Sequence, residues 1–216
     1  MVHLKKFIPF LMLVVVSCAS LPPPRNPQFT EANLPVAYRI EGIEPLKQLY
    51  NACVPTCAAM IFAYYGKPVD KDVIADWVQR AYGTSTRDIE DFALWQGFNI
   101  YSFTDPGLEK KKVKYFLTQN YPVLVGGKLG FSRLGHMIVL IGYDDAKTGD
   151  QKGKQYQGVF FVNDPAPGRE VMIPYGSFKE FHSGRDNICM VIYPKGGEKS
   201  WGRPLGGGSS RPGLRN

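Results

Sequence analysis

The segment from Gln48 to Gly66 constrains the fold most, because it places a cysteine at the start of a predicted helix. Its small and apolar residues predict a helix over 53–65 that stops at Gly66. A cysteine at a helix N-terminus can be held as a thiolate, since the helix dipole and a nearby imidazolium lower its pKa. Cys53 is therefore the candidate nucleophile. Cys57 lies one turn further in, where a buried core cysteine is expected.

Two later segments carry the groups that such a thiol needs. His136 enters the apolar run 136–143, and Asp164 follows the apolar run 159–163 and precedes Pro165. A carboxylate beside an imidazole fixes its tautomer, so the two could serve Cys53 together. The simpler alternatives are a core histidine bonded to the backbone and an aspartate that caps a turn. We expect Cys53, His136 and Asp164 to form a thiolate–imidazole nucleophile.

The remaining pattern predicts one α+β domain over 36–194, with N-terminal helices packed on a C-terminal antiparallel sheet. The polar insert 144–158 is expected to be a hairpin loop away from the thiol, and His182 is expected to lie in a loop. Further helices are predicted over 70–82, 86–96 and 108–118. Strands are predicted over 36–43, 99–103, 121–126, 136–143, 159–163, 170–173 and 187–193.

The N-terminus has the pattern of an export signal. Lys5 and Lys6 precede an apolar run over 7–16 that is too short to span a bilayer as a permanent helix. Val15, Val16, Ser17 and Cys18 then resemble a bacterial lipobox, whose cysteine becomes the lipidated first residue. An ordinary signal peptide with a chance cysteine is the alternative. We expect a lipoprotein signal peptide over 1–17 and a Pro-rich tether over 18–35, with lipid on Cys18 holding the protein at a membrane.

The distribution of charge and the composition of the tail limit the classes of binding partner. The formal net charge of +7 divides into +2 for residues 1–17, +4 for residues 195–216 and +1 for the residues between. The nearly neutral domain gives no electrostatic basis for binding nucleic acid. The tail 195–216 is rich in glycine and proline, which predicts a disordered basic extension.

The cysteine and histidine content argues against a metal or cofactor site. Lipidation of Cys18 would leave three of the four cysteines, so at least one thiol stays free. Cys57 could pair with Cys189. The mature chain would keep only His136 and His182, without the Cys-x-x-Cys or His-x-x-x-His spacing of common metal sites. We therefore expect neither metal nor cofactor.

Several motifs recur in a fixed order along the chain. They are Gln48 with Cys53, Cys57 and Gly66; Thr84 with Asp88 and Gly97; Tyr121-Pro122; Gly135-His136 with Gly142; Asn163-Asp164-Pro165; and Pro174 with Phe178. Together they resemble the bacteriocin-processing (double-glycine leader) cysteine peptidases in a stand-alone lipoprotein form. The similarity covers about residues 36–194 and implies a papain-like fold. It also implies that Cys53 is the nucleophile, His136 the general base and acid, Asp164 the group that orients the imidazole, and Gln48 the oxyanion-hole donor.

The chain departs from the family pattern at three points. Val54 stands where the family usually has glycine, Gln48 lies five rather than six residues before Cys53, and the insert 144–158 lengthens the spacing between His136 and Asp164. These departures affect the oxyanion hole more than the three reacting groups.

The expected function is an exported, lipid-anchored cysteine peptidase that cuts a peptide or isopeptide bond through a thioester acyl-enzyme. Its substrate would be a peptide or protein of the bacterial cell envelope, and we expect a monomer at the outer membrane, facing the periplasm. The alternative is a non-catalytic papain-like module that binds peptides or envelope polymers, because Val54 could spoil the oxyanion hole.

Overall fold

A computed structural model describes residues 34–80, 83–105, 111–128, 135–151, 153–184 and 187–196. The predicted signal peptide 1–17, the tether up to residue 33 with Cys18, and the tail beyond residue 196 lie outside these residues. Within the described residues, no helix is long and apolar enough to cross a membrane.

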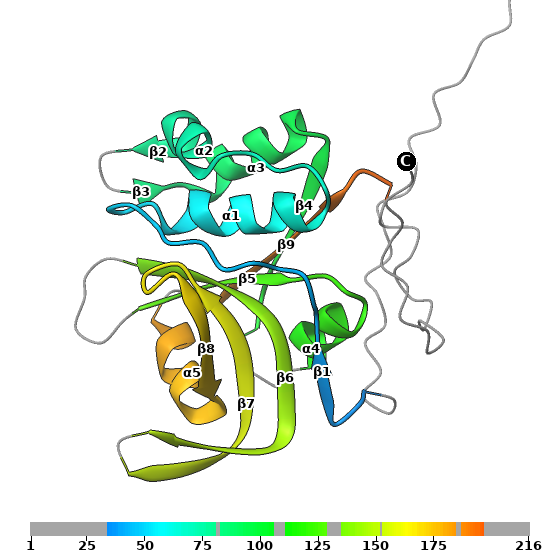
Figure 1. Ribbon diagram of the computed structural model, residues 1–216, viewed down its shortest axis with the longest axis vertical. Coiled ribbons are helices and arrows are strands. Elements are labelled where there is room, and N and C mark those ends of the chain that lie inside the picture. The colour runs from blue at the N-terminus through cyan, green and yellow to red at the C-terminus, as the bar shows by residue number, and fades with distance from the viewer. Residues whose placement is uncertain are drawn as a thin grey trace, which may run out of the picture.

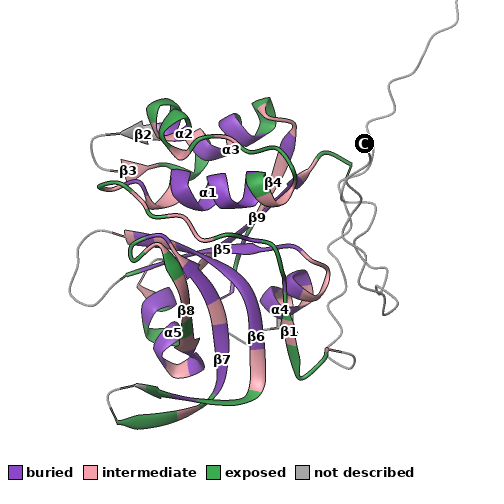
Figure 2. Ribbon diagram, viewed as in Figure 1, coloured by how far each residue is buried: buried purple, intermediate pink, exposed green. Residues whose placement is uncertain are grey.

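The centre of the fold is a seven-stranded antiparallel sheet (Figure 1). Its strands are β1 (Ala37–Arg39), β4 (Phe98–Thr104), β5 (Val123–Lys128), β6 (Gly135–Gln151), β7 (Lys154–Asp164), β8 (Arg169–Pro174) and β9 (Ile188–Pro194). They lie in the order β4-β9-β5-β6-β7-β8, and β1 pairs with β6 beyond the end of β5. β5 and β9 are almost fully buried, as is the part of β6 over 138–143 (Figure 2).

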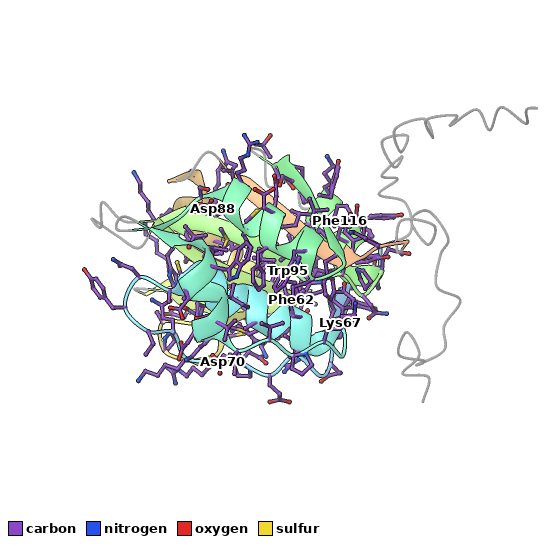
Figure 3. The ribbon with its side chains drawn as sticks, turned by 90° about the horizontal axis from the view of Figure 1, so that it is seen from above. Phe62, Lys67, Asp70, Asp88, Trp95 and Phe116 are labelled. Carbon is purple, nitrogen blue, oxygen red and sulfur yellow. The ribbon has the colours of Figure 1, made fainter. Side chains whose placement is uncertain are left out.

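Three helices form a layer above one end of this sheet, as Figure 1 shows. They are α1 (Cys53–Tyr64), α2 (Lys71–Val78) and α3 (Thr86–Trp95). α1 ends before Gly66, whose φ of 75° suits glycine, as predicted. Ser85 caps α3 by accepting from the Asp88 N–H. Phe62 of α1 lies in the middle of this layer (Figure 3), where its ring contacts Phe92 and Phe98.

Two further helices cover the sheet: α4 (Lys111–Thr118) and α5 (Tyr175–Ser183). Asp145 of β6 links the two helices, because it binds both the Lys114 ammonium of α4, with both contacts at 2.6 Å, and the Tyr175 hydroxyl of α5. The α+β architecture expected from the sequence, with helices packed on an antiparallel sheet, is therefore confirmed.

The prediction of a loop over 144–158 is wrong. These residues continue β6 and β7 as a long, mostly exposed hairpin arm, paired from Thr148 with Gln157 to Gln151 with Lys154 (Figure 2). Two aromatic rings hold the base of the arm: Tyr175 packs on Gly158, and Tyr156 packs on Gly176. A Cβ at either glycine would collide with the ring. This packing stabilises the continued pairing of β6 with β7, which the polar sequence of the arm does not predict.

Other element boundaries also differ. The helix predicted over 70–82 ends at Val78, because Gln79 and Arg80 pair as β2 (Gln79–Arg80) with β3 (Gly83–Thr84). α4 is described from Lys111, and the predicted start of this helix at residue 108 lies outside the described part of the chain. His182 is not in a loop: it is fully buried in the last turn of α5, where its Nδ1 lies 3.0 Å from the Gly126 carbonyl oxygen.

Candidate active site

Cys53 is the first residue of α1 and opens into a surface cleft of about 200 Å³. The first N–H groups of a helix lack intrahelical partners, so this position carries a positive partial charge. Ala52 precedes it and has no polar side chain to cap the helix. The lining residues are Gln48, Asn51, Cys53, Val54, Gly83, Thr84, Thr86, Gly126, Gly135, His136, Met137 and Ile188.

His136 bridges Cys53 and Asp164. Its Nε2 lies 2.7 Å from Asp164 Oδ1, and it also hydrogen bonds to the Cys53 side chain. With Nε2 facing the carboxylate, Nδ1 is the ring nitrogen left for the sulfur. His136 stands near the start of β6 and Asp164 at the end of β7, so the antiparallel pairing brings both to the same end of the sheet as the start of α1.

The electrostatics favour a charged pair. Burial alone would raise the pKa of Cys53, but hydrogen bonds to His136, Met137 and Val54 together with the His136 charge lower it. Burial alone would lower the pKa of His136, but the hydrogen bonds and charges of Asp164 and Cys53 raise it to about 9. Both shifts favour a thiolate beside an imidazolium over the neutral pair.

Further contacts hold Asp164 and the His136 imidazole in place. Asp164 Oδ1 accepts a second hydrogen bond from the Ala166 N–H at 2.9 Å. The Phe181 ring stands edge-on to the His136 ring, with centroids 6.3 Å apart, and it occupies the space that a Cβ on Gly127 would need. These contacts restrict the rotation of the imidazole.

Gln48 lines the same cleft as Cys53 and His136. Its backbone N–H donates to the Pro165 carbonyl over 2.9 Å, and its buried Oε1 has no hydrogen-bond partner among the described residues. The preceding chain is tied to β7 by Asn163, whose Nδ2 donates to the Ile43 carbonyl at 2.8 Å. An amide held at this position can present its N–H groups to an oxygen beside Cys53.

The structure brings together all four residues that the sequence singled out within the domain, namely Cys53, His136, Asp164 and Gln48. Sequence reasoning missed Met137, whose backbone N–H donates to the Cys53 sulfur. No sequence signal could have found it, because any residue supplies that group. It also missed Asn51, whose left-handed φ of 56° turns the chain into α1, although an Asn before a helix favours this conformation.

The cysteines of the described residues are free thiols. The possible bond between Cys57 and Cys189 is therefore not formed: Cys57 donates to the Met137 carbonyl, whereas Cys189 lies 3.7 Å from His182 Nε2. Across the described residues, no group of three or more His, Cys, Asp or Glu side chains is arranged to hold a metal ion.

Comparisons with known proteins confirm the papain-like fold expected from the sequence. A sequence model of the Peptidase_C39 like family matches residues 40–184. No curated protein sequence matches the chain significantly.

Solved structures of low sequence identity share the fold. A putative C39-like peptidase from Bacillus anthracis is 15% identical, with a TM-score of 0.58 over 74% of this chain and 98% of its own. The peptidase domain of the bifunctional ABC transporter ComA from Streptococcus is 20% identical, with a TM-score of 0.52 over 71% of this chain and 100% of its own. The double glycine motif protease of an AMS/PCAT transporter, solved with its leader peptide, is 22% identical, with a TM-score of 0.50 over 73% and 99%.

Proposed function

The chain belongs to the Peptidase_C39 like family, and from this premise we propose that it is an exported, lipid-anchored cysteine peptidase. The observation that carries the proposal is the unbroken chain of contacts from the Cys53 sulfur through the His136 ring to the Asp164 carboxylate, at the edge of an open cleft. The reaction is hydrolysis of a peptide or isopeptide bond.

Each group has one role in the proposed reaction. The Cys53 thiolate attacks the scissile carbonyl carbon, and the imidazolium of His136 protonates the leaving amine as the C–N bond breaks. A thioester on Cys53 remains. His136 then takes a proton from a water molecule, whose oxygen attacks the thioester carbon. The C–S bond breaks, the carboxylic acid leaves, and the Cys53 thiolate forms again beside the imidazolium. Asp164 keeps the ring in the orientation that both steps need.

The oxyanion of each tetrahedral intermediate is stabilised by Gln48 and the Cys53 backbone N–H. The Gln48 side chain lines the cleft. The N–H of Cys53, the first residue of α1, has no acceptor within the helix and is therefore available to the oxyanion. A developing negative charge gains more from such donors than the neutral carbonyl of the substrate does.

The proposed substrate is a peptide or protein of the cell envelope. The AMS/PCAT protease was solved with a leader peptide, which supports a peptide as the kind of ligand for this fold. Export and anchoring rest on the signal pattern and on Cys18, with residues 18–35 as the spacer between lipid and domain. The protein acts as a monomer, needing neither metal nor cofactor, at the outer membrane facing the periplasm.

One observation favours a second function. Val54 lines the cleft directly after Cys53, where the family usually has glycine, and a β-branched side chain there narrows the space for an acyl group. A non-catalytic module that binds peptides or envelope polymers would tolerate this. The two functions differ in one variant: Val54→Gly would create hydrolysis in a module that had lost it, whereas in a working peptidase it changes only the rate and the substrates accepted.

The decisive experiment compares peptides released from envelope proteins by wild type, Cys53→Ala and Cys189→Ala. Cys189 is a fully buried thiol away from the cleft, so its variant controls for the loss of a cysteine. The proposal expects products from wild type and Cys189→Ala and none from Cys53→Ala. Equal products from Cys53→Ala would contradict it, and the absence of products from all three would favour the binding module.

A further inference from the structure

The start of β6 has an unusual neighbour on one edge. β5 covers one edge of β6 down to Gly135, but the pairing with β7 on the other edge stops at Val139. At Met137 the edge of β6 that β7 leaves unpaired faces the start of α1, because the Cys57 thiol of that helix contacts the Met137 carbonyl. The backbone groups that β7 would have satisfied must therefore find partners on the helix.

The backbone N–H and C=O of Met137 both have hydrogen-bond partners on cysteines of α1. The Cys57 thiol donates to the Met137 carbonyl over 3.4 Å, and the Met137 N–H donates to the Cys53 sulfur. The N–H and C=O of one strand residue point to the same edge, and residues four apart on a helix lie on the same face. Cys53 and Cys57 thus bracket a single residue of β6, the one that follows His136.

We propose that Cys57 is a positioning residue for the nucleophile: its thiol holds the Met137 peptide so that the amide N–H points at the Cys53 sulfur. The proposal rests on the proposed function only in taking Cys53 as the nucleophile. Since Met137 follows His136 directly, the same hydrogen bond fixes the backbone that carries the imidazole.

The surroundings of Cys57 suit a permanent donor. Its side chain is fully buried, and burial together with the charges of Cys53 and Asp164 raises its pKa well above the ordinary value. It therefore stays protonated wherever Cys53 is a thiolate, and S–H remains a donor. A cysteine that only filled space could be replaced by any small residue, whereas this role requires a donor.

The titratable groups around the two cysteines are His136 from β6, which acts on Cys53, and Asp164 from β7, which acts on Cys57 and on His136. Neither His136 nor Asp164 is itself altered in a Cys57 variant. A change in the thiolate population of Cys53 in such a variant therefore reports the Met137 peptide, through its N–H on the sulfur or through the imidazole of the residue before it.

The test measures the rate of alkylation of Cys53 by iodoacetamide against pH, read from the mass of the peptide that contains Cys53. Cys57→Ser keeps a donor and Cys57→Ala does not, while Cys189→Ala removes an equally buried thiol from another part of the fold. We expect the Cys57→Ala profile to move to higher pH, with about a tenfold lower rate at acid pH for each unit of displacement. Cys57→Ser and Cys189→Ala should keep the wild-type profile.

A second pair keeps the test decisive if Cys57→Ala does not fold. Cys57→Thr and Cys57→Val have nearly the same shape and differ in the hydroxyl donor, so Val should displace the profile and Thr should not. A folded variant without a donor but with the wild-type profile would overturn the proposal. No substrate is used, so failure of the peptide-release experiment would overturn the peptidase function and leave this result independent.

Discussion

The Gln48 N–H donates to the carbonyl oxygen of Pro165 over 2.9 Å, which ties the proposed oxyanion-hole residue to the residue after Asp164. The turn that begins there closes on itself, because the Gly168 N–H donates to the Asp164 carbonyl. Gly168 also lies against Lys47, where a Cβ would stand 2.5 Å from the Lys47 Cβ. One turn therefore supports groups on both sides of the cleft.

We predict that Gly168→Ala lowers kcat as well as stability. Its φ of 66° costs a non-glycine residue about 1 to 3 kcal/mol, and the added Cβ would push the chain at Lys47 and displace Gln48. Gly153→Ala is the matched control, since Gly153 has a φ of 76° but no described heavy atom within 4 Å of the added Cβ. Urea unfolding should show a loss in both variants, and peptide hydrolysis a loss only in Gly168→Ala. Equal kcat values for the two would contradict the coupling.

Gln48→Ala should lower kcat by about 10²- to 10³-fold with little change in KM, the effect of losing one oxyanion-hole donor. Alkylation of Cys53 by iodoacetamide serves as the internal control. It passes through no tetrahedral oxyanion, so its rate should stay at the wild-type value. A fall in both rates would mean that Gln48 acts on the thiol itself.

Asp164→Asn should lower kcat by up to about 10⁴-fold, the order found when a triad carboxylate becomes an amide. The carboxylate raises the pKa of His136, so its removal should bring that pKa down from about 9 toward the ordinary value. NMR titration of the imidazole measures this directly. An unchanged His136 titration in the folded variant would show that Asp164 does not act on the ring.

Cys18→Ser tests the proposed anchor. The variant should move from the membrane fraction to the soluble periplasmic fraction, because a lipid chain is added only to the cysteine. Immunoblots of the two fractions measure it, with Cys189→Ala as the control that keeps the lipidation site. A Cys18→Ser protein that stays in the membrane fraction would refute the lipoprotein interpretation.

The sequence predicted those parts of the fold whose signals are local. The helix from Cys53 and the strands that carry His136 and Asp164 have apolar patterns of their own. The hairpin arm does not, because its residues are polar and its pairing depends on Tyr156 and Tyr175 packing on glycines distant in sequence. α5 was missed because Gly176 and Gly184 are residues typical of turns, although Tyr175, Phe178 and His182 recur at helical spacing and are buried.

The residues of the site also fall into those that the sequence could predict and those that it could not. Side chains with recognisable chemistry could be named beforehand. The structure brings Gln48, Cys53 and His136 to one cleft, with Asp164 hydrogen bonded to His136. Backbone groups could not, because the Met137 N–H and the Pro165 carbonyl acquire a role only when β6, β7 and α1 meet. The role of Cys57 as a donor was hidden for the same reason, although its burial was foreseen.

The most direct test of the thiolate–imidazolium pair is the pH dependence of Cys53 alkylation in wild type and in His136→Ala. The imidazole lowers the pKa of Cys53 through a hydrogen bond and its charge, against burial, which raises it. Wild type should therefore react rapidly at neutral pH, with its rise in rate at a lower pH than an ordinary thiol shows. His136→Ala should react slowly there and rise only at alkaline pH. Identical profiles for the two proteins would contradict the account.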